Sequence, residues 1–111
     1  MSVAPSVCTI LYVQWMQRFE WDEAKNTSNR KKHGVDFATA TLVFDDPFCV
    51  SFIERVSDGE ERWHSIGMIE DILALVVVHT YMVDGPDEII RIISCRPATS
   101  HERKLYDKAN S

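Results

Sequence analysis

The sequence lacks most of the patterns that mark disulfide frameworks, metal sites and membrane spans. Its three cysteines, Cys8, Cys49 and Cys95, are odd in number and form no CxxC pair, which favours a reducing compartment such as the cytoplasm. The four histidines are too scattered to suggest metal-ligand spacing, and no apolar run has the length of a membrane span. Phosphate-binding loops and metalloprotease motifs are also missing. We therefore predict no metal, no cofactor and no membrane partner.

Charge is present but unevenly distributed. The net charge is −5, yet residues 18–33 carry +2, residues 34–90 carry −10 and residues 91–111 carry +3. If the two basic ends meet in the fold, the surface is polarised. A uniformly acidic protein would repel nucleic acid, whereas a polarised one can bind it.

The length of 111 residues suits a single domain. We expect residues 19–111 to form it and residues 1–18, which are apolar, to be an N-terminal extension. A secretory signal is disfavoured because no basic region precedes the apolar run and Gln14 interrupts it. The extension is then either an added strand or the product of a translation start upstream of the true one, with Met16 close to the start of the charged pattern.

Helix signals bracket three segments. A short strand at residues 19–21 leads to Asp22, a good N-cap, and the following helix should end at Gly34. Asp36 is expected to cap a second short helix that ends before residue 45, and Ser100 to cap a closing helix. The helices therefore occupy both ends of the chain.

Between these helices the hydrophobic period changes to that of strands. Four strands are predicted, over residues 48–56, 62–69, 73–82 and 88–95. Asp58-Gly59 and the Asp-Gly-Pro run at 84–86 favour hairpin turns, so the strands should pair antiparallel. The unbroken run LALVVV is typical of a central strand covered on both faces. The sequence predicts an α+β fold, with helices packed on a mostly antiparallel sheet of four to five strands.

Two arginines lie on or beside the last apolar strand. If that strand runs regularly, Arg91 faces away from Ile90, Ile92 and Ser94, and Arg96 shares the side of those three. An arginine on a strand is expensive to bury unless it is paired. Arg91 either pairs with a carboxylate such as Glu60 or Glu61, or lies exposed and binds a phosphate with its planar fork. Spacing alone favours the ion pair.

Two further patterns contain residues able to transfer protons. Glu60, Arg62 and His64 should share one strand face, which supplies a base, a charge stabiliser and a proton donor, although the same row also suits a solvated face. His79 follows a run that must be core. It is either a hydrogen-bonded structural residue or a proton-transfer group at a strand end that reaches a cleft.

Five blocks of the sequence together resemble a known family. They are FEWDxxKxxxNxxKHGVxF, VFxDP, GEERxxxIG, LxVVVHT and RIISxRxATxxERxxY, in this order from Phe19 to about Tyr106. No single block is decisive, but the set is specific. The chain is identified by these blocks as resembling the BrnT toxins of bacterial type II toxin–antitoxin systems, and residues 1–18 lie outside the match.

The resemblance implies a RelE-like fold and a small cytoplasmic ribonuclease that cleaves RNA without a metal and arrests translation. It also implies a BrnA-like antitoxin of the ribbon-helix-helix type, bound in a heterotetramer, which neutralises the toxin and contacts operator DNA. Two alternatives remain open. In the first, the chain is a non-catalytic module that binds an antitoxin or RNA. In the second, it is a degenerate toxin that is retained for operon control and whose N-terminal extension blocks the cleft.

The resemblance also makes the charged residues in the matching blocks candidates for catalysis and RNA binding. Metal-free RNA cleavage needs a base for the 2′-hydroxyl, a cation for the phosphorane and an acid for the 5′-oxygen. The candidate catalytic residues are Arg62, His79, Arg91, Arg96 and Glu61, with Glu60 as the alternative to Glu61. The candidate RNA-binding residues are Lys25, Lys32, His33 and Arg103. We expect them to meet in one basic cleft.

Overall fold

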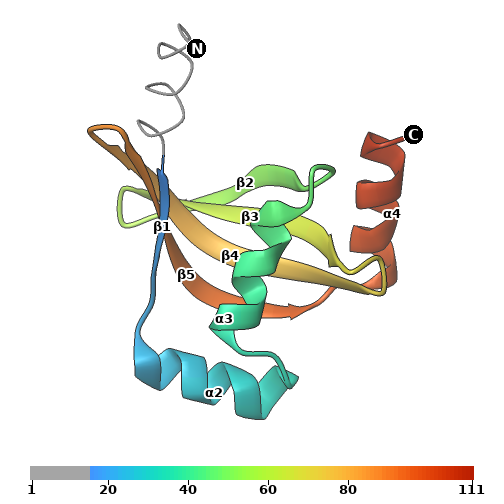
Figure 1. Ribbon diagram of the computed structural model, residues 1–111, viewed down its shortest axis with the longest axis horizontal. Coiled ribbons are helices and arrows are strands. Elements are labelled where there is room, and N and C mark those ends of the chain that lie inside the picture. The colour runs from blue at the N-terminus through green and yellow to red at the C-terminus, as the bar shows by residue number, and fades with distance from the viewer. Residues whose placement is uncertain (1–15) are drawn as a thin grey trace, which may run out of the picture.

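The protein is described by a computed structural model that defines residues 16–111, so the expectations about residues 1–15 lie outside it. Its elements follow the predicted order, with a 3₁₀ helix added after the second helix (Figure 1). They are β1 (Met16–Glu20), α2 (Glu23–His33), α3 (Phe37–Ala40), η1 (Thr41–Asp45), β2 (Val50–Ser57), β3 (Glu60–Ile69), β4 (Leu73–Asp84), β5 (Asp87–Pro97) and α4 (Ser100–Ala109).

The strands form one five-stranded sheet in the order β1-β5-β4-β3-β2. Strands β2 to β5 pair antiparallel through the predicted hairpins, and β1 adds at the edge parallel to β5. β4 is the central strand, as its unbroken apolar run predicts. The predicted α+β class, with a mostly antiparallel sheet and a C-terminal helix, is confirmed.

Local capping chemistry sets most helix ends where the sequence places them. The Asp22 carboxylate accepts hydrogen bonds from the first backbone N–H groups of α2, and Gly34 ends that helix at φ +75°. The prediction for the last helix is wrong by one residue. Thr99, rather than Ser100, is its N-cap, because Thr99 and Glu102 form a reciprocal capping box.

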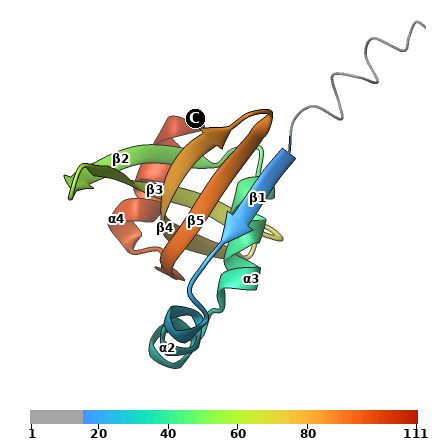
Figure 2. The same ribbon diagram turned by 90° about the vertical axis from the view of Figure 1, so that its left-hand side faces the viewer.

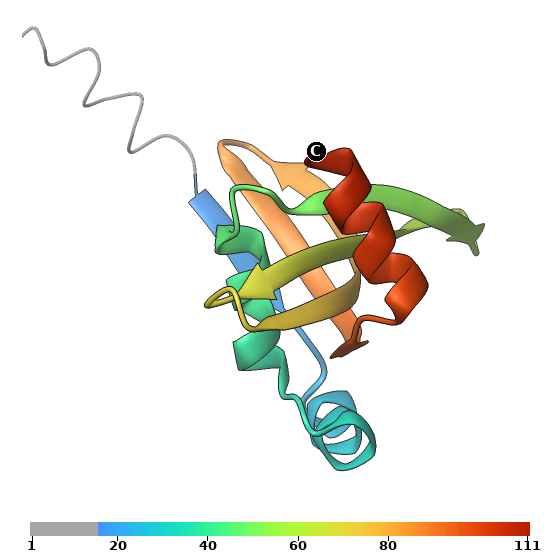
Figure 3. The same cartoon turned by 90° about the vertical axis from the view of Figure 1, so that its right-hand side faces the viewer.

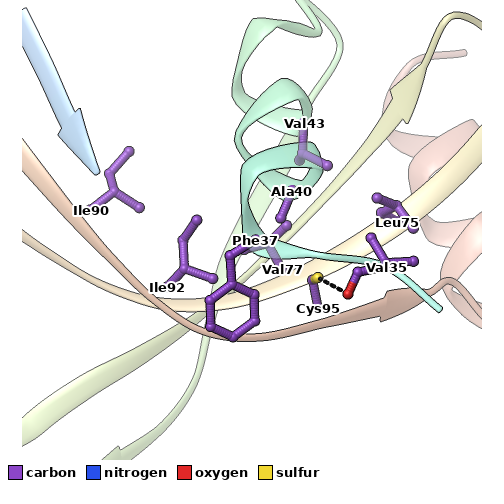
Figure 4. Packing of buried hydrophobic residues seen from close by; sticks show 9 residues of the cluster. All are labelled: Val35, Phe37, Ala40, Val43, Leu75, Val77, Ile90, Ile92 and Cys95. Carbon is purple, nitrogen blue, oxygen red and sulfur yellow. Dashed lines mark hydrogen bonds between the residues drawn. The ribbon is translucent and has the colours of Figure 1, made fainter. Parts of the chain in front are cut away.

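Two hydrophobic layers hold the sheet between its helices. On one face, Phe37 and Val43 from α3 and η1 pack on Val77 and Ile92 of the sheet (Figure 4). On the other face, Tyr106 of α4 packs with a smaller group, and α4 crosses the sheet over β3 (Figure 3). Within residues 16–111, no helix is long and apolar enough to cross a membrane.

One glycine of β3 is required by the close approach of η1. A Cβ on Gly67 would lie 2.8 Å from Val43 Cγ1 and 2.9 Å from the Val43 carbonyl oxygen, so the helix would have to move. We expect Gly67→Ala to lower the free energy of unfolding by about 2–3 kcal/mol, as overpacking does, in urea titrations followed by circular dichroism. Gly59→Asn lies at a turn with no neighbour within 4 Å but at φ +77°. Because asparagine tolerates this conformation better than most residues, it should lower the free energy of unfolding by about 1 kcal/mol or less. Equal stability of the two variants would contradict this packing.

Candidate functional site

A bulge in β5 places the two arginines of the last strand on the same face of the sheet. Val78 pairs with Ser94, but the next residue, His79, pairs with Ile92, so Ile93 is an extra residue in β5. Alternation therefore restarts at the bulge. Arg91 and Arg96, which a regular strand would put on opposite faces, both lie on the face that carries α4. The expectation of opposite faces is wrong because the strand is not regular.

The same face receives Arg62 and His64 from β3. His64 and Ser94 pair with Val78 from its two sides, and Arg62 and Arg91 lie on the strands to either side of Thr80. Because neighbouring strands are about 4.8 Å apart, each of these pairs spans roughly 10 Å across the strand between them. We call Arg62, His64, Arg91, Ser94 and Arg96 the arginine face. It lies beside α4 and is not covered by α3, which stands on the other side of the sheet (Figure 2).

Arg62 and Arg91 each have a loose acidic partner. The Arg91 guanidinium lies 3.8 Å from Glu20 and is 49% exposed, and Arg62 lies 3.6 Å from Glu60. The predicted row of Glu60 and Arg62 is thus present, whereas the partner of Arg91 is Glu20 of β1. Arg62 Nε is buried and finds no hydrogen-bond partner among residues 16–111. Such unpaired donors are rare in native proteins and are found at functional sites. Both guanidiniums can therefore take further ligands.

Arg96 is bound far more tightly. Its two terminal nitrogens donate to the two carboxylate oxygens of Glu102 at 2.7 and 2.8 Å. Glu102 also caps α4 through the Thr99 backbone N–H. The hydrogen bonds from Arg96 lower the pKa of Glu102 to about 2 and raise the pKa of Arg96. This ion pair fastens α4 to β5, so Arg96 has a structural task besides any contact with a ligand.

The ion pair should make folding sensitive to acid. The folded pKa of Glu102, about 2, lies below its ordinary 4.5, so the pair stabilises the protein above pH 4.5 and its contribution is lost as pH falls toward 2. We expect Arg96→Gln to lower the free energy of unfolding at pH 7 by on the order of 2 kcal/mol, and by much less near pH 3. Urea titrations at both pH values measure this.

Arg103→Gln is the matched control for that experiment. It removes an ion pair with Asp107 within α4, at 3.4 Å, in which both side chains are about half exposed. Such exposed pairs contribute about 0.5 kcal/mol or less. If the Arg96 variant lost no more stability than this control, the ion pair between Arg96 and Glu102 would not form in solution.

A basic hollow adjoins the arginine face where β1 ends. Its volume is about 470 Å³, and it lies between α2 and the part of β5 that β1 does not cover. Its lining consists of Lys25, Ser28, Asn29, Lys32, His33, Ile93, Ser94 and Arg96. Three of the four predicted RNA-binding residues are thus brought together with one predicted catalytic residue. This is the meeting of basic N-terminal and C-terminal segments that the charge pattern allows.

Asn29 holds α2 in place beside the strand. Its side-chain amide donates to the carbonyls of Val35 and Cys95 at 2.9 and 2.8 Å and accepts from the Cys95 N–H at 3.1 Å. One buried side chain thereby satisfies the edge of β5 as a neighbouring strand would. Sequence reasoning did not single out Asn29, although it stands in the block matched to the family. Its signal is a polar residue on the helix face that must be buried.

His79 is not part of the arginine face. It lies on the opposite face of β4 and is only 4% exposed. Its Nδ1 is 3.0 Å from the Thr80 carbonyl, which can only accept, so Nδ1 carries the proton. Nε2 must then accept from the Ser65 hydroxyl, 2.7 Å away, whose oxygen accepts from Ser51 at 2.7 Å.

This hydrogen-bonded chain corrects the expected place of His79. Burial lowers the pKa of the imidazole, which keeps it neutral, and both ring nitrogens already have partners. His79 therefore joins β4 to β3 and β2 from within the core layer. His79 also helps to line a hollow walled by Phe44, Trp63 and Tyr81. Its ring is therefore hydrogen-bonded as in the structural interpretation and borders a cleft as in the catalytic one, and its role stays a prediction.

Two other predicted residues also lie apart from this group. Glu61 is exposed and, by alternation from Arg62, points to the face of His79. Arg103 lines a different hollow between the start of β4 and the start of α4. The structure thus gathers Lys25, Lys32, His33 and Arg96 in the basic hollow. Arg62 and Arg91 share the sheet face of Arg96 but do not line that hollow, and His79, Glu61 and Arg103 lie apart from both groups.

The chemistry available at the arginine face is that of anion binding with a nearby imidazole. A guanidinium keeps its charge at any physiological pH and can donate two parallel hydrogen bonds to two oxygens of one phosphate. His64 is partly exposed and packs on Phe52, so an imidazole lies beside these cations. Among the described residues, no group of three or more His, Cys, Asp or Glu side chains is arranged to hold a metal ion.

Comparisons with known proteins identify the family that the chain resembles. The family model described as the ribonuclease toxin BrnT of type II toxin–antitoxin systems matches residues 21–102. Among solved structures, the crystal structure of the Brucella abortus ribonuclease toxin BrnT is similar, with a TM-score of 0.58 and 26% sequence identity over 77% of this chain and 99% of that one. No curated protein matches the sequence.

Proposed function

The chain belongs to the family of BrnT ribonuclease toxins of type II toxin–antitoxin systems, and from this premise we propose that it is a metal-independent endoribonuclease whose site is the arginine face. The observation that supports this most is the bulge at Ile93, which turns Arg91 and Arg96 to the side of Arg62.

Arg62 and Arg91 stabilise the phosphate during cleavage. They flank Thr80 at a spacing of roughly 10 Å between backbones, and arginine side chains extend far enough to bind one phosphate from both sides. Charge accumulates on the non-bridging oxygens as the 2′-oxygen attacks phosphorus, so fixed cations there lower the barrier. The loose ion pairs with Glu20 and Glu60 are exchanged for the phosphate when RNA binds.

His64 and Glu60 are the acid–base pair of this proposal. Both lie on the face of Arg62, since alternate residues of β3 share a face. The base removes the 2′-hydroxyl proton as the new O–P bond forms. The acid then protonates the 5′-oxygen as the P–O bond breaks, leaving a 2′,3′-cyclic phosphate. His79 and Glu61, the earlier candidates, have no path to this phosphate through the sheet.

The basic hollow continues the RNA path beyond the scissile phosphate. Lys25, Lys32 and His33 stand on α2 at its rim together with Arg96. Backbone phosphates of single-stranded RNA repeat along the strand, so a run of cations binds them without reading the sequence. This supports an RNA ligand several nucleotides long.

The partner in this proposal is a ribbon-helix-helix antitoxin of the BrnA kind, bound in a heterotetramer that contacts operator DNA through the antitoxin. The two-component nature of the family supports it. RNA cleavage in the cytoplasm arrests translation, and the antitoxin neutralises it there.

An assay with the purified full chain and single-stranded RNA tests the proposed chemistry. We expect cleavage that persists in EDTA, yields cyclic-phosphate ends and stops when the 2′-hydroxyl at the cut position is replaced by hydrogen. Loss of cleavage in EDTA, restored by magnesium, would contradict metal independence. Tight RNA binding with no cleavage under any condition would instead indicate a binding module.

A further inference from the structure

The sheet face opposite the arginine face carries exposed apolar side chains near the turns. Ile53 and Val56 of β2 and Tyr81 and Val83 of β4 are between 42% and 63% exposed. Trp63 of β3 stands between the two strands and is partly buried. We call these five residues the apolar face.

Cross-strand pairing puts them on one side of the sheet. Trp63 pairs with Ile53 on one neighbour and with His79 on the other. Side chains at every second position share a face, so Tyr81 and Val83 follow His79 outward along β4. Val56 lies beyond the bulge of β2 and pairs with Glu61, which puts it on the same side of the sheet. The apolar face is thus continuous over three strands.

No helix of the described chain covers this surface. α3 and η1 stand over the middle of the sheet, and the β2–β3 and β4–β5 turns project beyond them on the left of Figure 1. Where the apolar face meets η1 there is a hollow of about 270 Å³, walled by Phe44, Trp63 and Tyr81. A contiguous apolar patch with a hollow for one large side chain is the usual form of a protein-docking surface.

The charges around the apolar face select the partner. Alternation places Glu61 of β3 and Glu88 of β5 on this face, and both are acidic. His79 of β4 lies on the same face but is buried. Glu88 accepts a hydrogen bond from the Tyr81 hydroxyl at the edge of the hollow. The arginines lie on the other side of the sheet. An acidic rim around an apolar centre would repel RNA and attract a protein segment with flanking lysines or arginines.

We propose that the apolar face is the docking surface for the antitoxin, which presents an amphipathic segment with an apolar side chain in the hollow and basic residues opposite Glu61 and Glu88. This inference rests on the proposed function, because it takes the antitoxin as the partner. β3 connects the two surfaces, since Trp63 points to the apolar face while its neighbours Arg62 and His64 point to the arginine face. Neutralisation can therefore begin from a contact that does not compete with RNA for the arginines.

Co-expression with the product of the neighbouring reading frame tests the docking surface. Val56→Asp and Val83→Asp each introduce a like charge beside the acidic rim. We expect the two variants to cleave RNA like the wild type in vitro, to bind the partner at least 10-fold more weakly and to arrest growth despite it. The control is Ile72→Asp, in the β3–β4 turn, where the side chain is 81% exposed. It should be neutralised like the wild type.

The outcomes separate the two levels of the proposal. If the wild type binds the neighbouring product and both valine variants bind it equally well, the docking surface is elsewhere. If the wild type itself is not neutralised, the antitoxin part of the proposed function fails. Dimerisation of the free chain that either substitution abolishes would assign the apolar face to a second copy and overturn the inference. Val83→Ser, which adds no charge, should weaken binding of the partner less than Val83→Asp does. If the two variants lost the same affinity, the acidic residues around the apolar face would play no part in recognising the partner.

Discussion

Arg91→Ala should lower the rate of RNA cleavage by about 10²- to 10³-fold, the usual effect of removing one group that stabilises transition-state charge. Arg91 is the most open of the three arginines of the arginine face, with only a 3.8 Å contact to Glu20 to give up. Because it is half exposed, its removal should leave the free energy of unfolding nearly unchanged. The measurement is the single-turnover cleavage rate of a short RNA, with thermal unfolding of the same samples.

Two comparisons make the result specific to the arginine face. Arg91→Lys keeps the charge but not the planar fork, and it should recover only part of the rate. Arg30→Ala removes an exposed arginine of α2 that is not among the residues lining the basic hollow, and it should change the rate less than about 3-fold. A rate for Arg91→Ala as high as that of the Arg30 control would remove Arg91 from the site.

Asn29→Ala should be the most destabilising single change among the polar residues of α2, at about 3 kcal/mol. The substitution leaves the buried N–H of Cys95 and two carbonyls without their side-chain partner, and each unsatisfied buried group costs about 1–3 kcal/mol. Because α2 carries the lysines of the basic hollow, RNA affinity should fall as well. Chemical denaturation and a filter-binding assay measure the two effects.

Asn29→Asp gives a sharper version of the same test. The carboxylate has the size of the amide but has no N–H to donate, and it would face two carbonyl oxygens. It should be at least as destabilising at neutral pH and should recover stability in acid, when it is protonated. Ser28→Ala, at the exposed neighbouring position, should stay within about 0.5 kcal/mol of the wild type. Near-normal stability of both Asn29 variants would mean that α2 docks by other contacts.

The element order could be predicted from the sequence because each boundary has a local chemical cause. Asp22, Gly34 and Asp36 act on the residues next to them, so caps and turns are readable without the rest of the fold. The predicted pairing of Glu60 with Arg62 on one strand face is present for the same reason, since β3 is regular between them. Where a claim depends only on nearest neighbours, sequence reasoning is reliable.

The site was harder because it depends on an irregularity and on distant partners. A single extra residue, Ile93, reverses the alternation of β5 and decides that Arg91 and Arg96 share a face. Nothing in the local sequence marks that bulge. In the same way, Glu102 and Glu20 become the partners of the arginines only when α4 and β1 pack on the sheet. His79 has the residue type of a catalyst, but only the fold shows that both of its ring nitrogens are hydrogen-bonded on the face opposite the arginines.

The most direct test of the arginine face is to map where RNA binds. A short RNA whose 2′-hydroxyls are methylated cannot be cleaved and can be titrated into isotope-labelled protein, with amide chemical shifts followed by NMR. The largest changes should fall on Arg62, His64, Arg91 and Ser94 and extend to α2, while Tyr81 and Val83 on the opposite side stay unchanged. Changes centred on Tyr81 and Val83, with the arginine face silent, would contradict the assignment.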